Sequence, residues 1–260
     1  MPEEKKVVLK IDQMSHSFGG LKAVSNFNLD LPEGVIWGII GPNGAGKTTV
    51  FNLVTGVYRP DAGTIRFRGR DLVGLPPHRI VGAGVGRTFQ NIRLFRHLSV
   101  LDNVRTAHFG VTRTAVWRTL LRTPGCRRDE RDVVESSLRL LAALGLEGEA
   151  ETQARNLPYG RQRRLEIARA LATRPSLLLL DEPAAGMNPS EVDEMMGLIR
   201  RIRKEFSLTI LLIEHQMRMV MGVAERIVVL EFGEVIARGT PEEIRINPKV
   251  VEAYLGGDVT

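Results

Sequence analysis

The sequence has no long hydrophobic run, a single cysteine and few aromatic residues, and each shortage excludes a class of protein. Within the 260 residues, no apolar segment approaches the ~20 residues that a membrane-spanning helix needs. The first residues, MPEEKKVVLK, include too few consecutive apolar residues for a secretory signal, so we expect the chain to stay in the cytoplasm. Cys126 cannot form an internal disulfide, which is typical of a reducing compartment.

The formal net charge of +6 is compatible with a nucleic-acid partner or an acidic membrane surface. Much of this charge lies in Arg118–Arg131, RTLLRTPGCRRDER. This stretch has no aromatic residues among its arginines, whereas proteins that bind single-stranded nucleic acid stack bases on aromatic rings. We therefore interpret it as a solvated basic surface and expect no nucleic-acid partner, while contact with anionic lipid headgroups stays open as a minor role.

Hydrophobic periodicity predicts an α/β fold. VVLKIDQM and VSNFNLDL alternate in period two, which indicates antiparallel, half-buried strands in the first third of the chain. The apolar run from Val35 to Ile40 is typical of a buried strand, and helical patterns later alternate with the runs SLLLLDEP, LTILLIEH and RIVVL. Alternating helices and buried strands predict a mostly parallel sheet. We expect one domain over residues 1–260, with a helical subdomain inserted at about 96–160 and a C-terminal tail at about 240–260.

The most specific motif is GPNGAGKTT, which follows the buried strand directly and has the spacing of a phosphate-binding loop. Glycines let the backbone wrap closely around a polyphosphate, and the helix that begins near Lys47 directs its positive end at the anion. Lys47 would contact the β and γ phosphates and Thr48 would ligate Mg²⁺. The predicted nucleotide-binding residues here are Gly41, Pro42, Asn43, Gly44, Ala45, Gly46, Lys47, Thr48 and Thr49.

Two adjacent carboxylates end the run LLLLDEP. Asp181 would hold Mg²⁺ through its water shell, and Glu182 would accept a proton from the attacking water and orient that water. An Asp-Glu-Pro after a strand is usually only a polar turn. Together with the phosphate-binding loop, however, it predicts ATP hydrolysis.

The segment NLPYGRQRRLEIARAL lies just upstream of LLLLDEP, and with this arrangement the chain resembles the ABC ATPase family. The resemblance implies that two subunits enclose two ATP molecules, with the signature segment of one subunit capping the γ-phosphate held by the other. The signature residues matched in this way are Leu157, Tyr159, Gly160 and Arg161. Pro158 stands where the family usually has a serine, so the hydroxyl contact is missing. Arg161 would either contact phosphate or face solvent.

The resemblance implies roles for four further residues. Gln90 matches the glutamine that touches Mg²⁺ and the attacking water and faces the membrane partner, and His215 matches the histidine that contacts the γ-phosphate. Phe18 matches the aromatic residue that stacks on adenine, although core packing is the alternative interpretation. Asn188 would face the second subunit.

FGGLKAV, DEPAAGMNP, LLIEHQM and NPKVVEAYLG resemble the branched-chain amino-acid importers, in particular the G-type ATP-binding subunit of the Liv system. This resemblance implies ATP and Mg²⁺ as cofactors and a peripheral location on the cytoplasmic face of the inner membrane. The implied partners are a second ATPase subunit, identical or related, transmembrane permease subunits and, indirectly, a substrate-binding protein. The ending AYLG also occurs in the ATPase of lipopolysaccharide export, which remains an alternative. A soluble ABC ATPase acting on nucleic acid and a small-molecule kinase are further alternatives, which the single cassette and the LPYGR segment disfavour.

Overall fold

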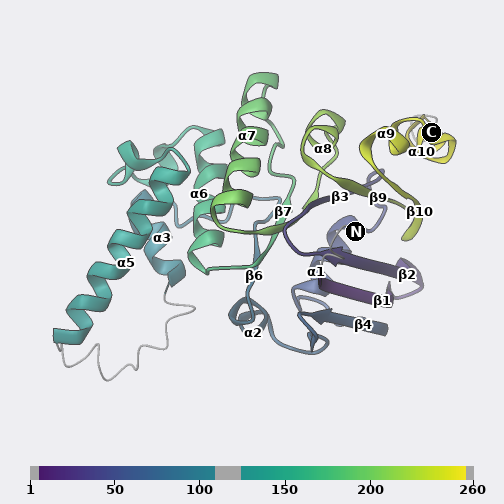
Figure 1. The fold of residues 1–260 in the computed structure, drawn as a ribbon, viewed down its shortest axis with the longest axis horizontal. Helices are drawn as coiled ribbons and strands as arrows, with labels where there is room; N and C mark the ends of the chain where they lie inside the picture. The colour runs from purple at the N-terminus through teal and green to yellow at the C-terminus, as the bar shows by residue number, and fades with distance from the viewer. Residues whose placement is uncertain (1–5, 109–123, 256–260) are drawn as a thin grey trace.

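Residues 6–108 and 124–255 are described in the computed structural model. A six-stranded sheet in the order β10-β9-β3-β8-β7-β6 forms its centre, and all neighbouring strands run parallel except the antiparallel pair β9 and β10 (Figure 1). The strands are β3 (Ile36–Ile40), β6 (Val85–Arg87), β7 (Leu177–Asp181), β8 (Thr209–Ile213), β9 (Arg226–Glu231) and β10 (Glu234–Gly239). This confirms the predicted mostly parallel sheet.

A second, antiparallel sheet has the order β2-β1-β4-β5. Its strands are β1 (Val7–Phe18), β2 (Leu21–Pro32), β4 (Ala62–Phe67) and β5 (Arg70–Asp71). Along β2 the buried residues alternate with more exposed ones, as the period-two pattern predicted, because one face of this sheet packs on the core.

Helices surround the central sheet, and Figure 1 shows α3, α5 and α6 grouped at one end of the molecule and α9 and α10 at the other. The helices are α1 (Lys47–Val54), α2 (Pro77–Gly82), α3 (Val100–His108), α5 (Pro124–Ala143), α6 (Tyr159–Ala172), α7 (Pro189–Glu205), α8 (Met217–Val223), α9 (Pro241–Arg245) and α10 (Pro248–Leu255), with short 3₁₀ turns at Glu147–Glu149 and Ala154–Asn156. Residues 118–123 of the basic stretch 118–131 lie outside the described residues, and its remainder belongs to the start of α5.

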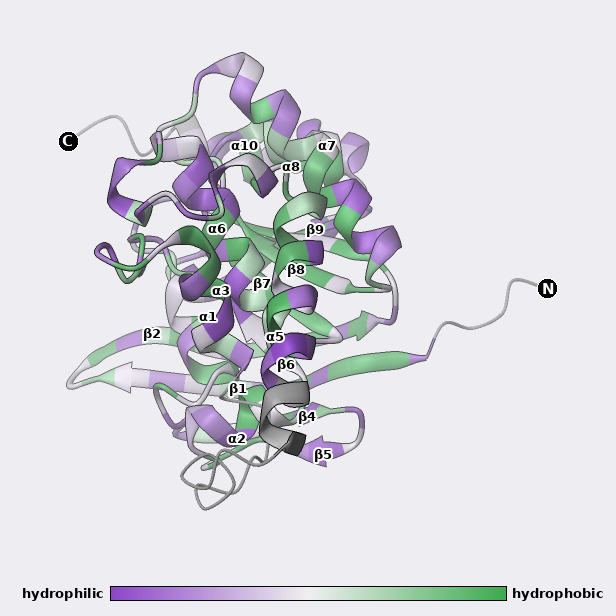
Figure 2. Ribbon diagram, turned by 90° about the vertical axis from the view of Figure 1, so that its left-hand side faces the viewer, coloured by the Kyte–Doolittle hydropathy of each residue, from purple (hydrophilic) through white to green (hydrophobic). Residues whose placement is uncertain are grey.

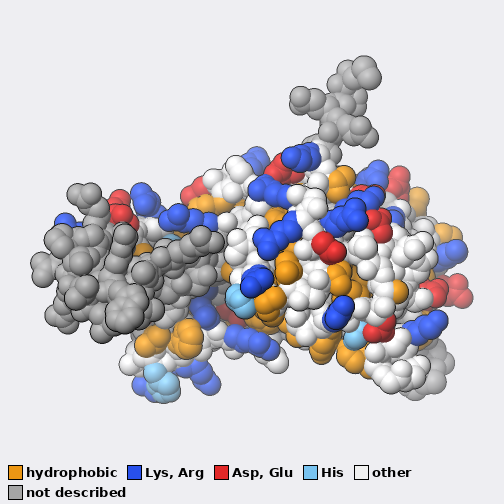
Figure 3. Space-filling view, turned by 90° about the horizontal axis from the view of Figure 1, so that it is seen from below, with side chains coloured by type: hydrophobic (Ala, Val, Ile, Leu, Met, Phe, Trp, Pro, Cys, Tyr) orange, Lys and Arg blue, Asp and Glu red, His pale blue; other side chains and the backbone are white. Residues whose placement is uncertain are grey.

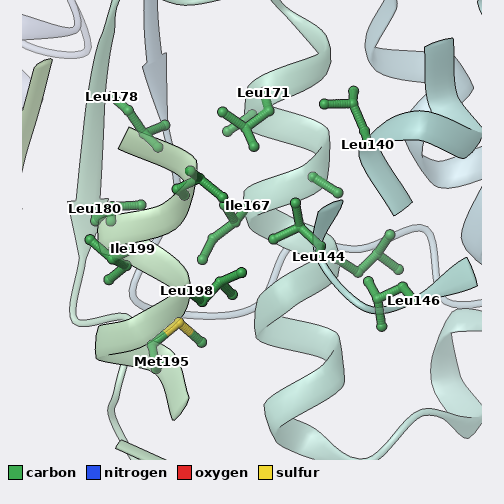
Figure 4. Close-up of a cluster of buried hydrophobic side chains, with 14 of the residues drawn as sticks. Leu140, Leu144, Leu146, Ile167, Leu171, Leu178, Leu180, Met195, Leu198 and Ile199 are labelled. Carbon is green, nitrogen blue, oxygen red and sulfur yellow. The ribbon is translucent and has the colours of Figure 1, made fainter. Parts of the chain in front are cut away.

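Strand β7 is buried on both faces, which explains its unbroken run of leucines. Leu178 and Leu180 belong to a core cluster with α6 and α7 (Figure 4), whereas Leu177 and Leu179 point into a second cluster with α1 and the antiparallel sheet. Figure 2 shows hydrophobic residues gathered in the central strands and hydrophilic residues on the outer sides of the helices. The carboxyl end of β7 is therefore the place where this strand can present polar groups.

Helix α7 begins with a capping box. The Asn188 side chain accepts hydrogen bonds from the backbone N–H groups of Ser190 and Glu191, and the Glu191 side chain accepts one from the N–H of Asn188. Pro189 occupies the first helical position, where its missing N–H costs no hydrogen bond. Asn188 thus has a local structural role beside the interface role that the family resemblance implies.

Basic, acidic and apolar side chains are mixed over the face in Figure 3. Among the exposed cations, Arg68 pairs with Glu33 at 2.6 Å, and Lys10 lies 3.5 Å from Asp12 and 3.4 Å from Asp30. The described surface therefore balances part of its positive charge with carboxylates.

Ile199 of α7 tests the packing between α7 and β7, because its side chain is fully buried in the cluster of Figure 4. We expect Ile199→Ala to lower the free energy of unfolding by about 2–5 kcal/mol, through lost apolar burial and the cavity left behind. Urea unfolding followed by circular dichroism measures this. The matched control is Leu138→Ala, because Leu138 is exposed, and equal losses in both variants would contradict the proposed packing.

Candidate functional site

The candidate site lies at the edge of the central sheet where β3, β8 and β7 end side by side. The phosphate-binding loop follows β3, Asp181 closes β7, and Glu214 and His215 follow β8. Parallel neighbouring strands bring their carboxyl ends to one edge, which is where α/β proteins bind ligands. Segments more than a hundred residues apart in sequence thereby share one site.

Two glycines fix the phosphate-binding loop against the rest of the protein. Gly41 has φ 152°, and a Cβ there would lie 2.0 Å from the carbonyl oxygen of Leu230. Gly46 has φ 99°, and its Cβ would lie 2.3 Å from the carbonyl oxygen of Ala23. Gly44 is exposed and a Cβ there would meet nothing within 4 Å. The loop therefore packs tightly at its two ends and stays open at Gly44, which fits a cradle for phosphate.

Lys47 lies at the start of α1 and folds over this loop. Its Nζ donates hydrogen bonds to the carbonyl oxygens of Gly41 at 2.7 Å and Pro42 at 2.8 Å. Burial lowers the pKa of Lys47, and the nearby carboxylates of Glu182 and Asp181 partly counter this effect. Thr48 is exposed and Thr49 is half-buried, so the Thr48 side chain is accessible for the metal contact predicted for it.

Asp181 is 1% exposed, and its two carboxylate oxygens have different surroundings. Oδ2 accepts a hydrogen bond from Nη2 of Arg87 at 3.0 Å, whereas Oδ1 has no hydrogen-bond partner among the described residues. Burial raises the pKa of Asp181, and Arg87 offsets part of this rise. A buried acceptor with no protein partner fits the predicted role of Asp181, because the water shell of a divalent cation would supply the missing donors.

Arg87 was not predicted from the sequence. Its side chain is 7% exposed, and besides Asp181 it donates hydrogen bonds to Asn52 Oδ1 at 2.8 Å, in the last turn of α1, and to Oγ1 of Thr55, the C-cap of α1, at 2.9 Å. Its guanidinium also lies 4.9 Å from the ring centroid of Phe89. The sequence signal that could have indicated Arg87 is its charge at a position three residues before Gln90. Arg87 therefore joins the helix that follows the phosphate-binding loop to the Asp181 carboxylate, which is predicted to bind the metal.

The structure brings Gln90, Glu182 and His215 together, although they lie on three separate loops. Gln90 Nε2 donates a hydrogen bond to Glu182 Oε2 at 2.9 Å, and His215 Nδ1 lies 3.6 Å from the same oxygen. Glu182 has φ 48°, a left-handed conformation that is strained for a residue with a side chain and that is often found at functional sites. Its carboxylate is thus held at a fixed place beside the other two groups.

Glu214, also missed by the sequence reasoning, fixes the turn before His215. The Glu214 carboxylate is completely buried and accepts hydrogen bonds from the N–H groups of Ala184 at 2.8 Å and His215 at 3.1 Å. Burial raises the pKa of Glu214, and these N–H groups counter the rise by stabilising the charged form. Glu214 therefore ties the loop that contains Glu182 to the loop that contains His215.

The signature residues have partners inside this chain. Leu157 is buried in the core and its carbonyl oxygen accepts a hydrogen bond from Gln162 Nε2, while the Tyr159 hydroxyl accepts from Arg163. Arg161 pairs with Glu149 and its side chain is 46% exposed, so within this chain it faces solvent. Within residues 6–108 and 124–255, no hydrogen bond or ion pair joins 157–161 to 41–49. One chain alone thus leaves these two predicted nucleotide-binding segments unconnected.

Phe18, predicted to stack on adenine, is 44% exposed, so core packing does not account for it. Its ring contacts His16 at a centroid distance of 4.7 Å and Tyr58 at 5.2 Å, both edge to face. Tyr58 follows α1, so these rings join the end of β1 to the segment after the phosphate-binding helix. An exposed, supported ring of this kind is suitable for stacking on a planar base.

The buried pair Arg87–Asp181 gives a stability prediction. We expect Arg87→Met to lower the free energy of unfolding by about 3–5 kcal/mol, because it leaves a buried carboxylate without its cation. The matched control, Arg68→Met, breaks a pair whose side chains are 50% and 45% exposed and should cost about 0–1 kcal/mol. Chemical unfolding of both variants at neutral pH measures the difference. A loss below 1 kcal/mol for Arg87→Met would argue against the buried pair.

Comparison with known proteins places this site in a family. The profile described as ABC transporter matches residues 24–185, and that of branched-chain amino acid ATP-binding cassette transporters matches 234–260. The chain is 50% identical to the high-affinity branched-chain amino acid transport ATP-binding protein LivG of Salmonella typhimurium, with 96% of this chain and 98% of that protein aligned. BraF of Pseudomonas aeruginosa is 47% identical with the same coverage, and the lipopolysaccharide export protein LptB of Acidithiobacillus ferridurans is 36% identical over 96% and 97%.

Solved structures agree with these relatives. The ADP conformation of MJ1267, an ATP-binding cassette of an ABC transporter, superposes with a TM-score of 0.85 at 28% identity and covers 97% of this chain and all of that one. The dimeric ABC transporter cassette MJ0796 has a TM-score of 0.75 at 25% identity, over 90% and 98% of the two chains. The chain belongs to the ABC transporter family as an ATP-binding protein.

Proposed function

We propose that this chain hydrolyses ATP to drive the import of branched-chain amino acids. The observation that carries the proposal is the 50% identity to LivG over nearly the full length of both proteins. The C-terminal match to branched-chain amino acid cassettes adds to it. An energising subunit of this kind works at the cytoplasmic face of the inner membrane as a peripheral protein. The described residues include no helix long and apolar enough to cross a bilayer.

Binding of ATP would depend on the phosphate-binding loop and the aromatic rim. In the proposed mechanism the N–H groups around Gly44 and the Lys47 ammonium contact the phosphates, and Phe18 stacks on adenine. Lys47 would have to exchange its bonds to the Gly41 and Pro42 carbonyls for phosphate oxygens. Thr48, Gln90 and Asp181 would hold Mg²⁺, Asp181 through water. The cation would neutralise charge that develops on the phosphates during transfer.

Glu182 is the proposed general base. Its carboxylate already accepts a hydrogen bond from Gln90 and lies near His215, so a water held among these three groups would face a proton acceptor of fixed position. Gln90 would orient that water, and His215 would contact the γ-phosphate. Glu214 would act on this arrangement indirectly, by holding the backbone of His215.

A second ATPase subunit is the proposed partner for catalysis. The separation of the signature segment from the phosphate-binding loop within one chain supports this, because a ligand touching both segments needs two subunits. The proposed capping of the γ-phosphate would rely on Gly160 and the N-terminal end of α6, since Pro158 offers neither hydroxyl nor N–H. The dimeric structure of MJ0796 provides the precedent.

The permease is proposed to dock beside the Gln90 loop. A cavity of about 350 Å³ lies there between the loop, α3 and α6, lined by apolar groups such as Val81, Phe89 and Ala170. Its charged lining has three arginines and one carboxylate, namely Arg87, Arg93, Arg169 and Glu166. A helix from a membrane subunit could place an apolar side chain in this cavity and acidic or carbonyl groups against the arginines. Movement of the docked helix would shift Phe89 and Arg93, which belong to the same loop as Gln90. Lipopolysaccharide export is the second candidate function, supported by the 36% identity to LptB and by the ending AYLG.

The role of Glu182 is tested by Glu182→Gln. We expect phosphate release from MgATP to fall about 10²–10⁴-fold, because the amide cannot accept the proton, while binding of a fluorescent ATP analogue is retained. Glu205→Gln, which changes an exposed residue at the end of α7, is the matched control and should hydrolyse ATP normally. Hydrolysis by Glu182→Gln at the wild-type rate would refute the assignment.

The substrate is tested by uptake. In cells that lack this gene, we expect uptake of radiolabelled leucine, isoleucine and valine to fall to background and to be restored by the wild-type chain but not by Lys47→Ala, which cannot grip the phosphates. Uptake of an unrelated amino acid serves as the control. Unchanged uptake in a strain with no second importer for these amino acids would favour lipopolysaccharide export or another solute.

A further inference from the structure

Helix α6 carries a buried cation, Arg163, that the mechanism above does not use. The Arg163 side chain is 4% exposed and is one helical turn beyond Tyr159. Its guanidinium has acceptors on several sides: Nη1 donates to Glu166 Oε2 at 3.0 Å, and Nε and Nη2 donate to the Tyr159 hydroxyl at 3.1 and 2.8 Å. A charge buried this deeply is costly unless all its donors are hydrogen-bonded. The groups that accept the remaining hydrogen bonds of Arg163 therefore indicate what it holds in place.

The remaining bonds of Arg163 hold the backbone of the Gln90 loop. Nη1 donates to the carbonyl oxygen of Phe89 at 2.8 Å, and Nη2 donates to that of Gln90 at 2.5 Å. The planar guanidinium suits this task, since its donors point in fixed directions and can grip two successive carbonyls. A lysine would offer only one compact donor group at this place.

Two neighbours on the same face of α6 extend the contact. Glu166 Oε1 accepts a hydrogen bond from the N–H of Arg93 at 2.9 Å, and Arg169 donates to the carbonyl oxygen of Arg93. Residues 163, 166 and 169 are spaced three apart, which places them in one row along a helix. The loop is therefore fixed to α6 at both of its ends, while the Gln90 side chain between them reaches Glu182 at 2.9 Å.

We propose that Arg163 is a positioning residue for ATP hydrolysis, which acts by fixing the main chain of Gln90 so that its side chain stays against Glu182. This inference rests on the proposed ATPase function. Arg163 touches neither Glu182 nor the phosphate-binding loop through any hydrogen bond among the described residues, so its hydrogen-bonded route to the site passes through Gln90. Its charge also favours the charged form of Asp181, an effect that Arg163→Lys preserves. Since Tyr159 bonds the same guanidinium next to Gly160, Arg163 also connects the signature segment to Gln90.

The test is a double-mutant cycle on the full-length chain, with steady-state phosphate release from MgATP as the first readout. Arg163→Lys keeps the buried charge, and the double variant Arg163→Met with Glu166→Gln removes both charges together, so that at least one of them should fold. Each is made with Gln90 intact and with Gln90→Ala. Thermal unfolding verifies folding, and the matched control is Arg164→Ala, because Arg164 pairs with the exposed Glu194 of α7 and makes no hydrogen bond to the Gln90 loop within the described residues.

With Gln90 intact we expect the kcat of the Arg163 variants to fall roughly tenfold, with binding of a fluorescent ATP analogue changed less than about twofold. In the Gln90→Ala background the same changes should lower kcat by a further factor of less than about two, because the side chain through which Arg163 acts is gone. Equal losses in both backgrounds would overturn the inference, since a general effect on folding would be additive. Arg164→Ala should remain within about twofold of the wild type.

Amide hydrogen exchange over residues 89–95 gives a readout that does not depend on hydrolysis. We expect the Arg163 variants to exchange faster in this loop, with α1 unchanged, and Arg164→Ala to exchange like the wild type. Unchanged exchange in the loop would overturn the inference even if hydrolysis fell. Failure of the proposed ATPase function is seen separately, as a wild-type chain that releases no phosphate above the level of Glu182→Gln.

Discussion

The burial of strand β7 on both faces is the constraint on which the arrangement of the site depends. Its leucines fill two separate core clusters, one with α6 and α7 and one with α1 and the antiparallel sheet. The carboxyl end is where this strand meets polar surroundings, so Asp181 and Glu182 must stand there. Strand β8 lies beside β7 and β3 lies beside β8, and all three run parallel. The phosphate-binding loop after β3 and His215 after β8 therefore reach the same edge of the sheet as Asp181.

Placing a carboxylate at the end of a buried strand has a cost, which other residues offset. Asp181 is buried enough for its pKa to rise, and Arg87 supplies the cation that favours its charged form. Glu214 is likewise stabilised by backbone N–H groups. These supporting groups fix positions as well as charges, since Arg87 joins β6 to α1 and Glu214 joins two loops of the site. The preorganisation of the site therefore depends on buried polar contacts outside the nucleotide-binding motifs.

The same principle extends to α6, where a buried arginine and glutamate bind the backbone of the Gln90 loop. The loop lies beside the cavity proposed for the permease, and α6 begins at the signature segment. The cavity, the signature segment and the Gln90 side chain are thus connected by a few hydrogen bonds. Their proposed partners differ: they are the membrane subunit, the second ATPase and the attacking water. Such a short connection is a physical route by which docking and closure could act on hydrolysis.

The order of residues along the chain was enough to establish the class of fold and to predict the phosphate-binding loop and the paired carboxylates, because these depend on local spacing and on hydrophobic period. It could also place His215 after a buried strand, and the family resemblance matched Gln90, but neither could show that both side chains approach one oxygen of Glu182. Arg87 and Asp181 are 94 residues apart in sequence, and Arg163 and Gln90 are 73 apart. No local pattern marks such pairs. The contact of Arg163 with the Gln90 loop was decided by tertiary structure, since a buried charge takes whichever partners the packed chain brings within hydrogen-bond distance.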